Sequence, residues 1–377
     1  MSGTSADGIN VAIVRLLGRG TAVRFSLLGE GQYEYPLAVR KAVLAAMNAR
    51  SASVADLSRL NFLLGNLYAD AVLATKKRAG VTKLDLIGCH GQTIYHQGEA
   101  SAYLGKSLTT TWQTGEGAIV AQRTGVPVVS DFRTADIAAG GKGAPLVPML
   151  DYVIYRHRAR GRILQNIGGI GNLTAIPAGA KLDDLMAFDT GPGNMVIDAC
   201  METLYGRRYD KDGKVAATGK PLDRVTAELL RGAYFKQKPP KTAGREEFGA
   251  DFVKTFLRMC GGARKEDVIA TATVFTVRTI AQSVQRFVLS KGENSFKDFV
   301  VAGGGTRNRT LMKYLAADLE PLNLGLRDSS EFGVPAESKE AIAFALLAYL
   351  TWNRQPGNVP SATGAKKAVI LGKISYA

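Results

Sequence analysis

The chain has 377 residues, 46% hydrophobic and 21% charged, with 48 Lys and Arg against 33 Asp and Glu and a formal net charge of +15. This composition is that of a folded globular protein of about two domains, and it excludes collagen-like, disordered and disulfide-scaffold classes. No segment approaches the ~18 consecutive apolar residues of a membrane helix, and the amino-terminal residues are polar. We therefore expect neither a membrane span nor a secretory signal.

The basic charge favours anionic partners. Basic residues form no run of five, and aromatic residues do not alternate with them as in single-strand platforms, so we do not expect nucleic acid as a partner. The scattered Cys89, Cys200 and Cys260 predict a reducing cytoplasm. The histidines do not cluster either, which argues against a structural zinc site.

In the first part of the chain, short strands alternate with longer helices. Strand patterns at 9–17 and 22–34 flank the glycines of 18–20 and predict a β-hairpin. Helical patterns follow at 36–49 and 53–79. A buried type of strand at 84–89 enters a polar glycine turn at 90–93, a helix is expected at 114–124, and another strand at 126–130.

A second series begins with a hairpin at 162–176 and a strand at 185–188 that leads to a helix near 193. Helices at 221–231, 249–259 and 266–289 precede a strand at 298–302, and helices at 310–319 and 339–352 precede a last strand at 369–375. The two halves share an order of strands and glycine turns, which predicts an α/β protein built of related halves around a ligand cleft. We expect one domain at 1–127, completed by 366–377, and a second at 128–365.

Three glycine-rich turns are candidate phosphate or nucleotide sites, because glycine lets the backbone approach a ligand closely. They carry Ser2, Gly3, Thr4, Ser5, Asp7 and Gly8, then Asn166, Gly168 and Gly169, then Gly303, Gly304 and Gly305. A polar terminal tail or ligand-free turns are the structural alternatives. Two familiar nucleotide motifs are missing: Ala100 stands where a P-loop ending at 105–107 needs its first glycine, and no GxGxxG opens a βαβ unit.

Two charged residues are candidates for chemistry. Asp189 ends a strand just before a glycine-rich entry into a helix, which suits a general base, although a helix N-cap is the alternative. Arg133 follows the strand at 126–130 and could clamp an anionic group, although an internal Asp–Arg pair is the alternative. Asp7 could hold a metal ion or orient a sugar hydroxyl.

A set of segments in order along the whole chain carries a family resemblance. They are MSGTSADG (1–8), HGQTIYH (90–96), DFRTADIAAGGKGAPLVP (131–148), NIGGIGN (166–172), FDTGPGNMVIDA (188–199), GGGTRN (303–308), KEAIAFA (339–345) and GNVPSATGA (357–365). The chain resembles the anhydro-N-acetylmuramic acid kinases of the sugar kinase/actin/heat-shock ATPase superfamily. This resemblance implies a two-domain, duplicated actin-like, ribonuclease H-like ATPase fold with an interdomain cleft.

The resemblance also implies roles for residues. Asp189 would be the general base and Arg133 the substrate-positioning arginine, with His90, Gln92 and Glu340 near the sugar. The three glycine-rich turns would bind ATP, and Asp7 and Glu340 would lie near Mg²⁺. The reaction would open the 1,6-anhydro bridge with water and phosphorylate O6, and the protein would be a homodimer.

The same motifs also fit a levoglucosan kinase, and an actin-like or chaperone-like ATP-binding protein is the alternative from another class. A basic nucleic-acid-binding protein is a third. Family members usually have a short apolar strand before the SGTS segment, whereas Met1 directly precedes that segment here. We expect further residues upstream; the alternative is a first phosphate loop that lacks support from the sheet and binds nucleotide poorly.

Overall fold

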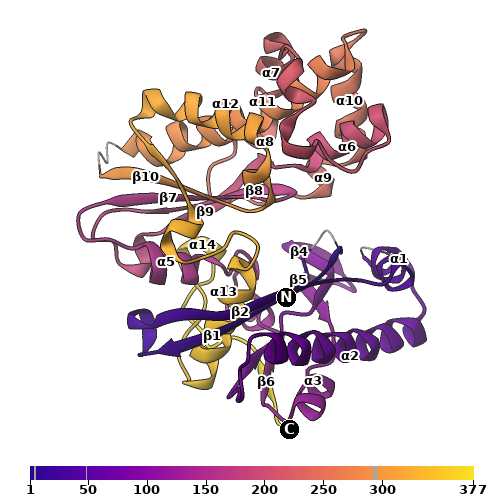
Figure 1. Cartoon of the computed structure of the whole chain (residues 1–377), viewed down its shortest axis with the longest axis vertical. Coiled ribbons are helices and arrows are strands. Elements are labelled where there is room, and N and C mark those ends of the chain that lie inside the picture. Colours follow the sequence, from indigo (N-terminus) through magenta and orange to yellow (C-terminus); the bar gives the residue numbers. More distant parts are fainter. Residues whose placement is uncertain (4–5, 48, 292–294) are drawn as a thin grey trace. The chain divides into compact units, whose positions relative to one another are not determined.

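The computed structural model describes residues 1–3, 6–47, 49–291 and 295–377. The chain divides into two compact units (Figure 1), which are described separately: unit 1 is Met1–Ile154 with Glu337–Ala377, and unit 2 is Tyr155–Ala336. Thr4 and Ser5, two of the expected nucleotide-binding residues, lie outside the described residues.

Unit 2 contains a five-stranded sheet in the order β11-β10-β7-β8-β9. Its strands are β7 (Gly161–Ile167), β8 (Ile170–Ile176), β9 (Met186–Pro192), β10 (Phe296–Ala302) and β11 (Gly325–Asp328). β7, β8 and β9 form an antiparallel meander, and β10 and β11 run parallel to β7. The expected hairpin at 162–176 and the ribonuclease H-like α/β unit are confirmed.

Helices cover this sheet and bury its apolar side chains. They are α6 (Met195–Tyr205), α7 (Asp223–Leu229), α8 (Ala233–Lys236), α9 (Arg245–Phe248), α10 (Ala250–Cys260), α11 (Lys265–Ser283) and α12 (Arg309–Leu319). Ile163 of β7, Phe299 of β10 and Phe275 of α11 are fully buried in the same core. Because β10 lies inside the sheet between β11 and β7, its last four residues, Phe299–Ala302, are all buried and all apolar instead of alternating.

Unit 1 contains three smaller sheets, β1-β2, β12-β6-β3 and β4-β5. Its strands are β1 (Gly8–Leu17), β2 (Arg24–Glu34), β3 (Ile87–Gly88), β4 (Gln92–Tyr103), β5 (Lys106–Thr114), β6 (Val128–Ser130) and β12 (Lys373–Ser375). Its helices are α1 (Leu37–Ala46), α2 (Val54–Arg78), α3 (Gly117–Thr124), α4 (Thr134–Ala138), α5 (Pro148–Tyr155), α13 (Lys339–Trp352) and α14 (Pro360–Thr363). The antiparallel β1–β2 hairpin and the parallel β3–β6 pair correspond to β8–β9 and β10–β11 of unit 2.

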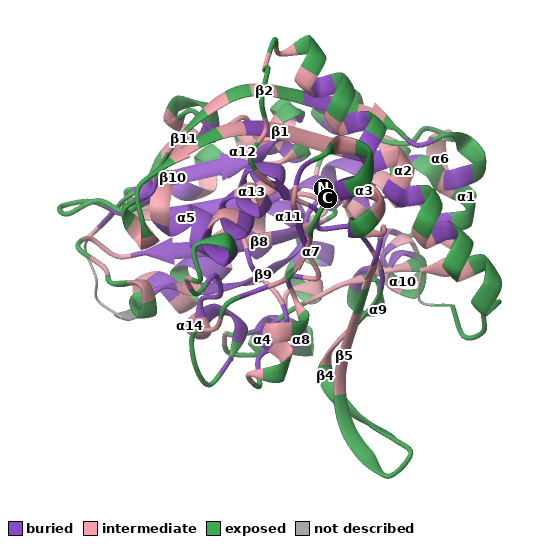
Figure 2. Cartoon of the chain, turned by 90° about the horizontal axis from the view of Figure 1, so that it is seen from below, coloured by how far each residue is buried: buried purple, intermediate pink, exposed green. Residues whose placement is uncertain are grey.

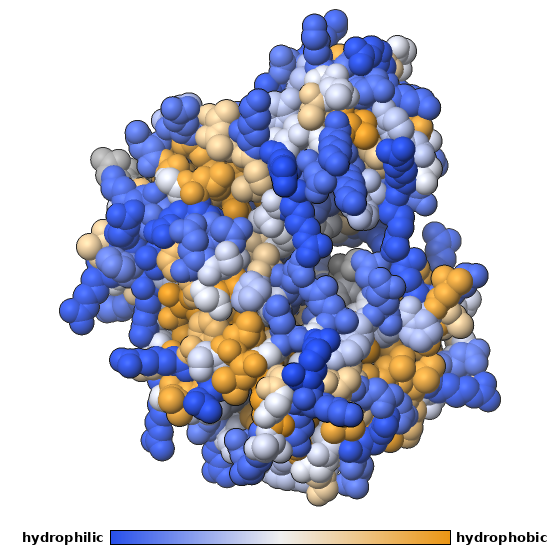
Figure 3. Space-filling model, in the orientation of Figure 1, coloured by the Kyte–Doolittle hydropathy of each residue, from blue (hydrophilic) through white to orange (hydrophobic). Residues whose placement is uncertain are grey.

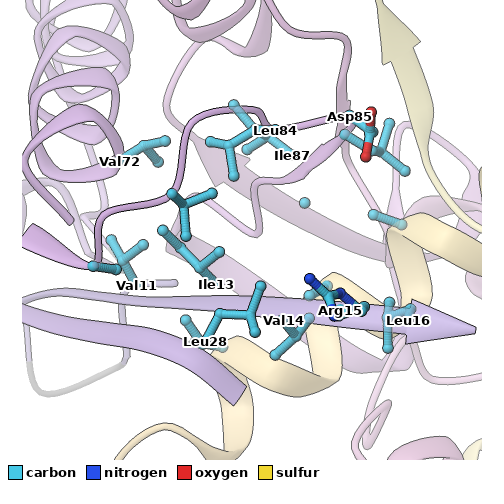
Figure 4. A pocket seen from close by; sticks show the side chains of 18 of the residues that line it. Val11, Ile13, Val14, Arg15, Leu16, Leu28, Val72, Leu84, Asp85 and Ile87 are labelled. Atoms are coloured by element: carbon cyan, nitrogen blue, oxygen red, sulfur yellow. The ribbon is translucent and has the colours of Figure 1, made fainter. Parts of the chain in front are cut away.

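An apolar slot of about 730 Å³ separates β1 from β3 in unit 1. Val11 and Ile13 of β1, Val72 of α2 and Leu84 point into it (Figure 4). Figure 3 shows apolar side chains reaching the surface around the β1–β2 hairpin. In unit 2 the corresponding position, between β8 and β10, is filled by β7. The β1-β2 sheet and the β12-β6-β3 sheet are therefore joined through α13, which packs on both β1 and β3, and no described strand of one pairs with a described strand of the other.

The β4–β5 hairpin was not expected from the sequence as a whole. Gln92 and Thr93, expected in a turn, are the first residues of β4 and pair with β5. The outer part of the hairpin is exposed (Figure 2), and polar side chains there leave no apolar alternation to read. The long helix α2 and the helix α13 agree with the predicted ranges of 53–79 and 339–352.

The fully buried carboxylate of Asp136 joins two distant segments of unit 1. Its Oδ1 accepts hydrogen bonds from the Asn358 side-chain amide and the Thr363 hydroxyl, both at 2.7 Å, and its Oδ2 accepts from the Gly143 amide at 2.8 Å. These bonds tie the 131–148 segment to the 357–365 segment. They are one reason why the compact units divide after Ile154 and Ala336, whereas we expected domain boundaries after 127 and 365 from the sequence.

We expect Asp136→Ala to lower the unfolding free energy of unit 1 by about 3 kcal/mol, because three buried donors lose their acceptor. Both tryptophans, Trp112 and Trp352, lie in unit 1, so the tryptophan fluorescence change in urea measures this transition. The control is Asp85→Ala at an exposed carboxylate, for which the change should stay within about 0.5 kcal/mol. Equal urea midpoints of unfolding for Asp136→Ala and Asp85→Ala would contradict the stabilising role of Asp136.

Candidate active site

A row of side chains crosses the sheet of unit 2 at the position of Asp189. In the strand register, Ala302 of β10 lies opposite Asn166 of β7, Asn166 opposite Asn172 of β8, and Asn172 opposite Asp189 of β9. Residues opposite one another in neighbouring strands project to the same face of a sheet. The structure therefore places the expected base and the expected nucleotide residue Asn166 on one face of unit 2.

Main-chain and side-chain hydrogen bonds hold Asp189 in a fixed orientation. Its amide donates to the Lys241 carbonyl at 3.0 Å, and its own carbonyl accepts from the Tyr234 hydroxyl at 2.6 Å. The Ala243 amide donates to Asp189 Oδ2 at 2.8 Å. The described residues donate no hydrogen bond to Oδ1, so this oxygen can accept a proton from a bound water.

Burial raises the pKa of Asp189 to about 7, because a half-buried carboxylate loses hydration. The Ala243 amide and the Lys241 ammonium oppose this rise, while the Glu246 carboxylate adds to it. A general base works best when its pKa lies near the working pH. This pKa and the open Oδ1 suit Asp189 to remove a proton near neutral pH.

The glycine turn between β7 and β8 packs against the entry to helix α6. The Asn194 amide donates to the Gly168 carbonyl at 2.7 Å, and the Gly193 and Met195 amides donate to the Gly169 carbonyl at 2.9 and 3.1 Å. A Cβ on Gly193 would lie 2.2 Å from the Gly168 carbonyl oxygen, so only glycine fits at position 193. The 188–199 segment thus carries the carboxylate and also supports the turn.

The Gly303–Gly305 turn packs against the same β7–β8 turn. A Cβ on Gly303 would lie 2.7 Å from Asn166 Oδ1, and one on Gly305 would lie 2.3 Å from Ile167 Cγ2. A Cβ on Gly304 would meet no described atom within 4 Å. Two of the three glycines are therefore required by packing, and Gly304 alone presents its backbone to open space. The structure brings all of the expected unit 2 nucleotide residues together.

The amino-terminal loop of unit 1 is held by buried polar contacts. The Ser2 hydroxyl lies 2.7 Å from Gln92 Oε1 and 2.8 Å from the Gly8 carbonyl oxygen, and it accepts from the Tyr35 hydroxyl at 2.8 Å. The Gln92 side-chain amide donates to the Gly3 carbonyl at 3.1 Å. Ser2 and Gln92 are both buried, so in this structure their side chains support the loop from inside.

Arg133 and His90 form the second polar cluster of unit 1. The Arg133 guanidinium donates to His90 Nε2 through Nε at 3.1 Å and through Nη2 at 2.9 Å, and Nη1 donates to the Gly143 carbonyl at 2.8 Å. His90 Nδ1 lies 2.8 Å from the Gly91 carbonyl oxygen, which assigns the ring proton to Nδ1. Burial and Arg133 hold the pKa of His90 well below its usual range, so the ring is neutral and orients the arginine.

The two expected metal ligands have different surroundings. Burial raises the pKa of Glu340, and Arg133, Lys339 and the Met1 ammonium oppose that rise. Asp7 is more exposed and pairs with Arg40 at 3.3 Å. No group of three His, Cys, Asp or Glu residues forms a metal cage within the described ranges. Such a cage is not required for Mg²⁺, which commonly uses one or two carboxylates together with phosphates and water.

Sequence reasoning missed Tyr234 and Lys241. Their contacts to Asp189 join residues far apart in the chain. No local pattern could have shown them. Asp189 lies in unit 2 and Arg133 in unit 1, so their action on one ligand stays a prediction. None of the helices in the described part of the chain has the length and apolar character for crossing a membrane.

Comparison with known proteins gives full-length matches. A family model described as anhydro-N-acetylmuramic acid kinase matches residues 1–377. An anhydro-N-acetylmuramic acid kinase of Caldanaerobacter subterraneus subsp. tengcongensis is 42% identical over 381 residues, covering all of this chain and 95% of that relative. One of Bacillus thuringiensis subsp. konkukian is 41% identical over 378 residues, covering all of this chain and 98% of that relative.

Among solved structures, a ROK family glucokinase of Streptomyces griseus, in complex with glucose and AMPPNP, matches at 12% identity with a TM-score of 0.36. The match covers 90% of this chain and 99% of that one. This likeness is too remote to assign any residue of the site.

The neutral His90 predicts a pH dependence of stability. The pKa of His90 is lower in the folded protein than in the unfolded chain, so the unfolded chain binds more protons below about pH 6.5. The free energy of unfolding therefore decreases as the pH is lowered below this value. This one group contributes a slope of up to about 1.4 kcal/mol per pH unit. Urea unfolding followed by tryptophan fluorescence between pH 5 and 7 should show a shallower slope for His90→Gln than for the wild type.

The control for this slope is His157→Gln, at an exposed histidine of unit 2. A wild-type slope that His90→Gln leaves unchanged would show that His90 is not kept neutral by its surroundings.

Proposed function

Because the chain belongs to the anhydro-N-acetylmuramic acid kinase family, we propose that it uses ATP and water to convert 1,6-anhydro-N-acetylmuramic acid to N-acetylmuramic acid 6-phosphate and ADP. The observation that carries this proposal is Asp189, a fixed carboxylate with one open oxygen and a pKa of about 7. Asp189 lies in the same row across the sheet as Asn166, which is two residues before the glycines of the β7–β8 turn.

In the proposed reaction, a water oxygen attacks the anomeric carbon while Asp189 Oδ1 accepts a proton from that water. The bond between C1 and O6 breaks, and its electron pair leaves with O6. O6 then attacks the γ-phosphorus of ATP, and ADP leaves. One sugar hydroxyl forms at C1, one phosphate ester forms at O6, and the proton held by Asp189 is released to solvent. General-base help of this type is worth about 10²–10⁴-fold in rate.

Arg133 is the proposed anchor for the sugar, with His90 behind it. The guanidinium remains charged at neutral pH although burial lowers its pKa to about 10. Two of its nitrogens are already held by His90, which fixes the plane of the guanidinium. A fixed cation is suited to a carboxylate such as that of a lactyl ether.

Glycine backbone around Gly168, Gly169 and Gly304 is the proposed nucleotide side, because open backbone permits close approach of a nucleotide. Mg²⁺, held by the ATP phosphates and water with Glu340 or Asp7 nearby, would neutralise charge on the transferred phosphoryl group. Oxygen ligands of these two residues fit the preference of Mg²⁺, and the absence of a three-residue cage among the described residues fits a metal that arrives with ATP.

The remaining proposals concern the setting of the reaction. A cytoplasmic location is supported by three cysteines that are all free and buried. A homodimer is supported by exposed apolar side chains on α1 and α2, among them Leu37 and Phe62.

Asp189→Asn should lower the rate of sugar-dependent ADP release by about 10²-fold or more, because an amide cannot accept the proton from water. ATP binding should stay within about twofold, since the amide keeps the shape of the carboxylate. A coupled assay measures ADP release with 1,6-anhydro-N-acetylmuramic acid, with levoglucosan and without sugar. Calorimetric titration measures the affinity for ATP. ADP release that needs no anhydro-sugar would contradict the proposed function, and preference for levoglucosan would change its substrate.

The pH profile of kcat should show the ionisation of Asp189. Below a pH of about 6 the rate should rise nearly tenfold per pH unit, and above about 8 it should level off, because only the ionised carboxylate accepts a proton. Initial rates between pH 5 and 9 at saturating substrate test this. A rate that stays constant from pH 5 to 7 would remove Asp189 from the role of base.

The glycine triplet offers a matched pair of variants. Gly305→Ala should lower unfolding free energy by about 1–3 kcal/mol, because its Cβ would overlap Ile167. Gly304→Ala should leave stability within about 0.5 kcal/mol yet weaken ATP binding about tenfold or more, because the added methyl group stands in the open space proposed for the nucleotide. Calorimetric melting and titration give both values. Unchanged ATP affinity in Gly304→Ala would show that the nucleotide lies elsewhere.

A further inference from the structure

A lysine outside all of the sequence motifs, Lys241, contacts the proposed base through its main chain. Lys241 is buried, with only 4% of the residue exposed. Its carbonyl accepts the Asp189 amide, and Ala243, two residues further on, donates to the Asp189 carboxylate. The 241–243 segment thus holds both the main chain and the side chain of Asp189.

The Lys241 ammonium lies against two aromatic rings that also contact the strand of Asp189. Nζ donates to the Tyr234 carbonyl at 3.2 Å and lies 4.4 Å from the centre of the Tyr234 ring and 5.0 Å from that of Phe287. Phe287 packs edge-on against Phe188, the residue before Asp189. Ring faces stabilise a cation that has lost much of its water. A buried cation that shares its aromatic neighbours with the strand of a half-buried acid is an arrangement that simple core packing does not require.

We propose that Lys241 is the positioning residue of this site: its main chain fixes Asp189, and its buried ammonium keeps the neighbouring carboxylate ionised so that it can accept a proton from water. This inference rests on the proposed function and assigns to that reaction a residue that never touches the sugar. The carboxylate accepts the proton, and Lys241 only changes how readily it does so.

The charged and titratable groups around the pair set the expected sign. Lys241 favours the ionised carboxylate and Glu246 disfavours it, while the Tyr234 hydroxyl binds the Asp189 carbonyl. Burial, with Arg286 nearby, lowers the pKa of Lys241 itself to about 8. The amine is therefore mostly protonated at neutral pH, where it acts on Asp189, and it loses this effect as the pH rises above about 8.

The test compares Lys241→Met with Lys241→Arg in the full chain. Methionine keeps an unbranched side chain and the main-chain hydrogen bonds but removes the charge, so the acid limb of the kcat profile should move to higher pH by about half a unit or more. Arginine keeps the charge and should leave this limb within about 0.3 unit of the wild type. Lys238→Met, at an exposed lysine of the same segment, is the matched control and should leave the limb in place.

Each outcome decides between the alternatives. A wild type without sugar-dependent turnover would overturn the proposed function, and with it this role. A wild type with turnover whose acid limb is the same in Lys241→Met would overturn the role of Lys241 alone. Lys241→Gln is the second neutral variant if the methionine variant does not fold. Failure of both neutral variants to fold would show that Lys241 is needed for structure and would overturn the proposal.

Discussion

A carboxylate that must accept a proton near neutral pH has to lose part of its hydration without losing its charge, and the site in unit 2 depends on this balance. Burial makes ionisation of Asp189 costly, and the Ala243 amide and the Lys241 ammonium offset part of that cost. The strand that carries Asp189 leads into the glycine-rich entry to α6, and this entry supports the β7–β8 turn. The position of the acid and the shape of the proposed nucleotide site therefore depend on the same backbone.

Both units contain an antiparallel hairpin and a parallel pair of strands, but among the described residues only unit 2 joins them into one continuous sheet. There β7 lies between β8 and β10 and joins five strands, whereas the apolar slot takes that position in unit 1. Unit 1 uses other contacts to hold its loops: Met1 exchanges hydrogen bonds with Asn10 at 2.9 and 2.8 Å, and Ser2 binds Gln92. The buried Asp136 then ties the segment of Arg133 to the 357–365 segment.

The sequence predicted those parts of the structure that apolar periodicity and glycine control. The hairpins β1–β2 and β7–β8 and the helices α2 and α13 lie where the apolar patterns placed them. The β4–β5 hairpin was missed because its outer half is exposed and polar. Asp189 and the glycine turns could be named from local motifs. Lys241 could not, because its contact to Asp189 is made only after the chain has folded and no spacing in the sequence encodes it.

The central claim is that water opens the anhydro ring while O6 takes the phosphoryl group. Reaction of 1,6-anhydro-N-acetylmuramic acid with ATP in ¹⁸O-water, quenched at once with borohydride so that the anomeric oxygen cannot exchange, tests it most directly. Mass spectrometry of the product should find one ¹⁸O at C1 and none in the phosphate on O6. Label in the phosphate, or a phosphorylated sugar with its anhydro ring intact, would contradict the account.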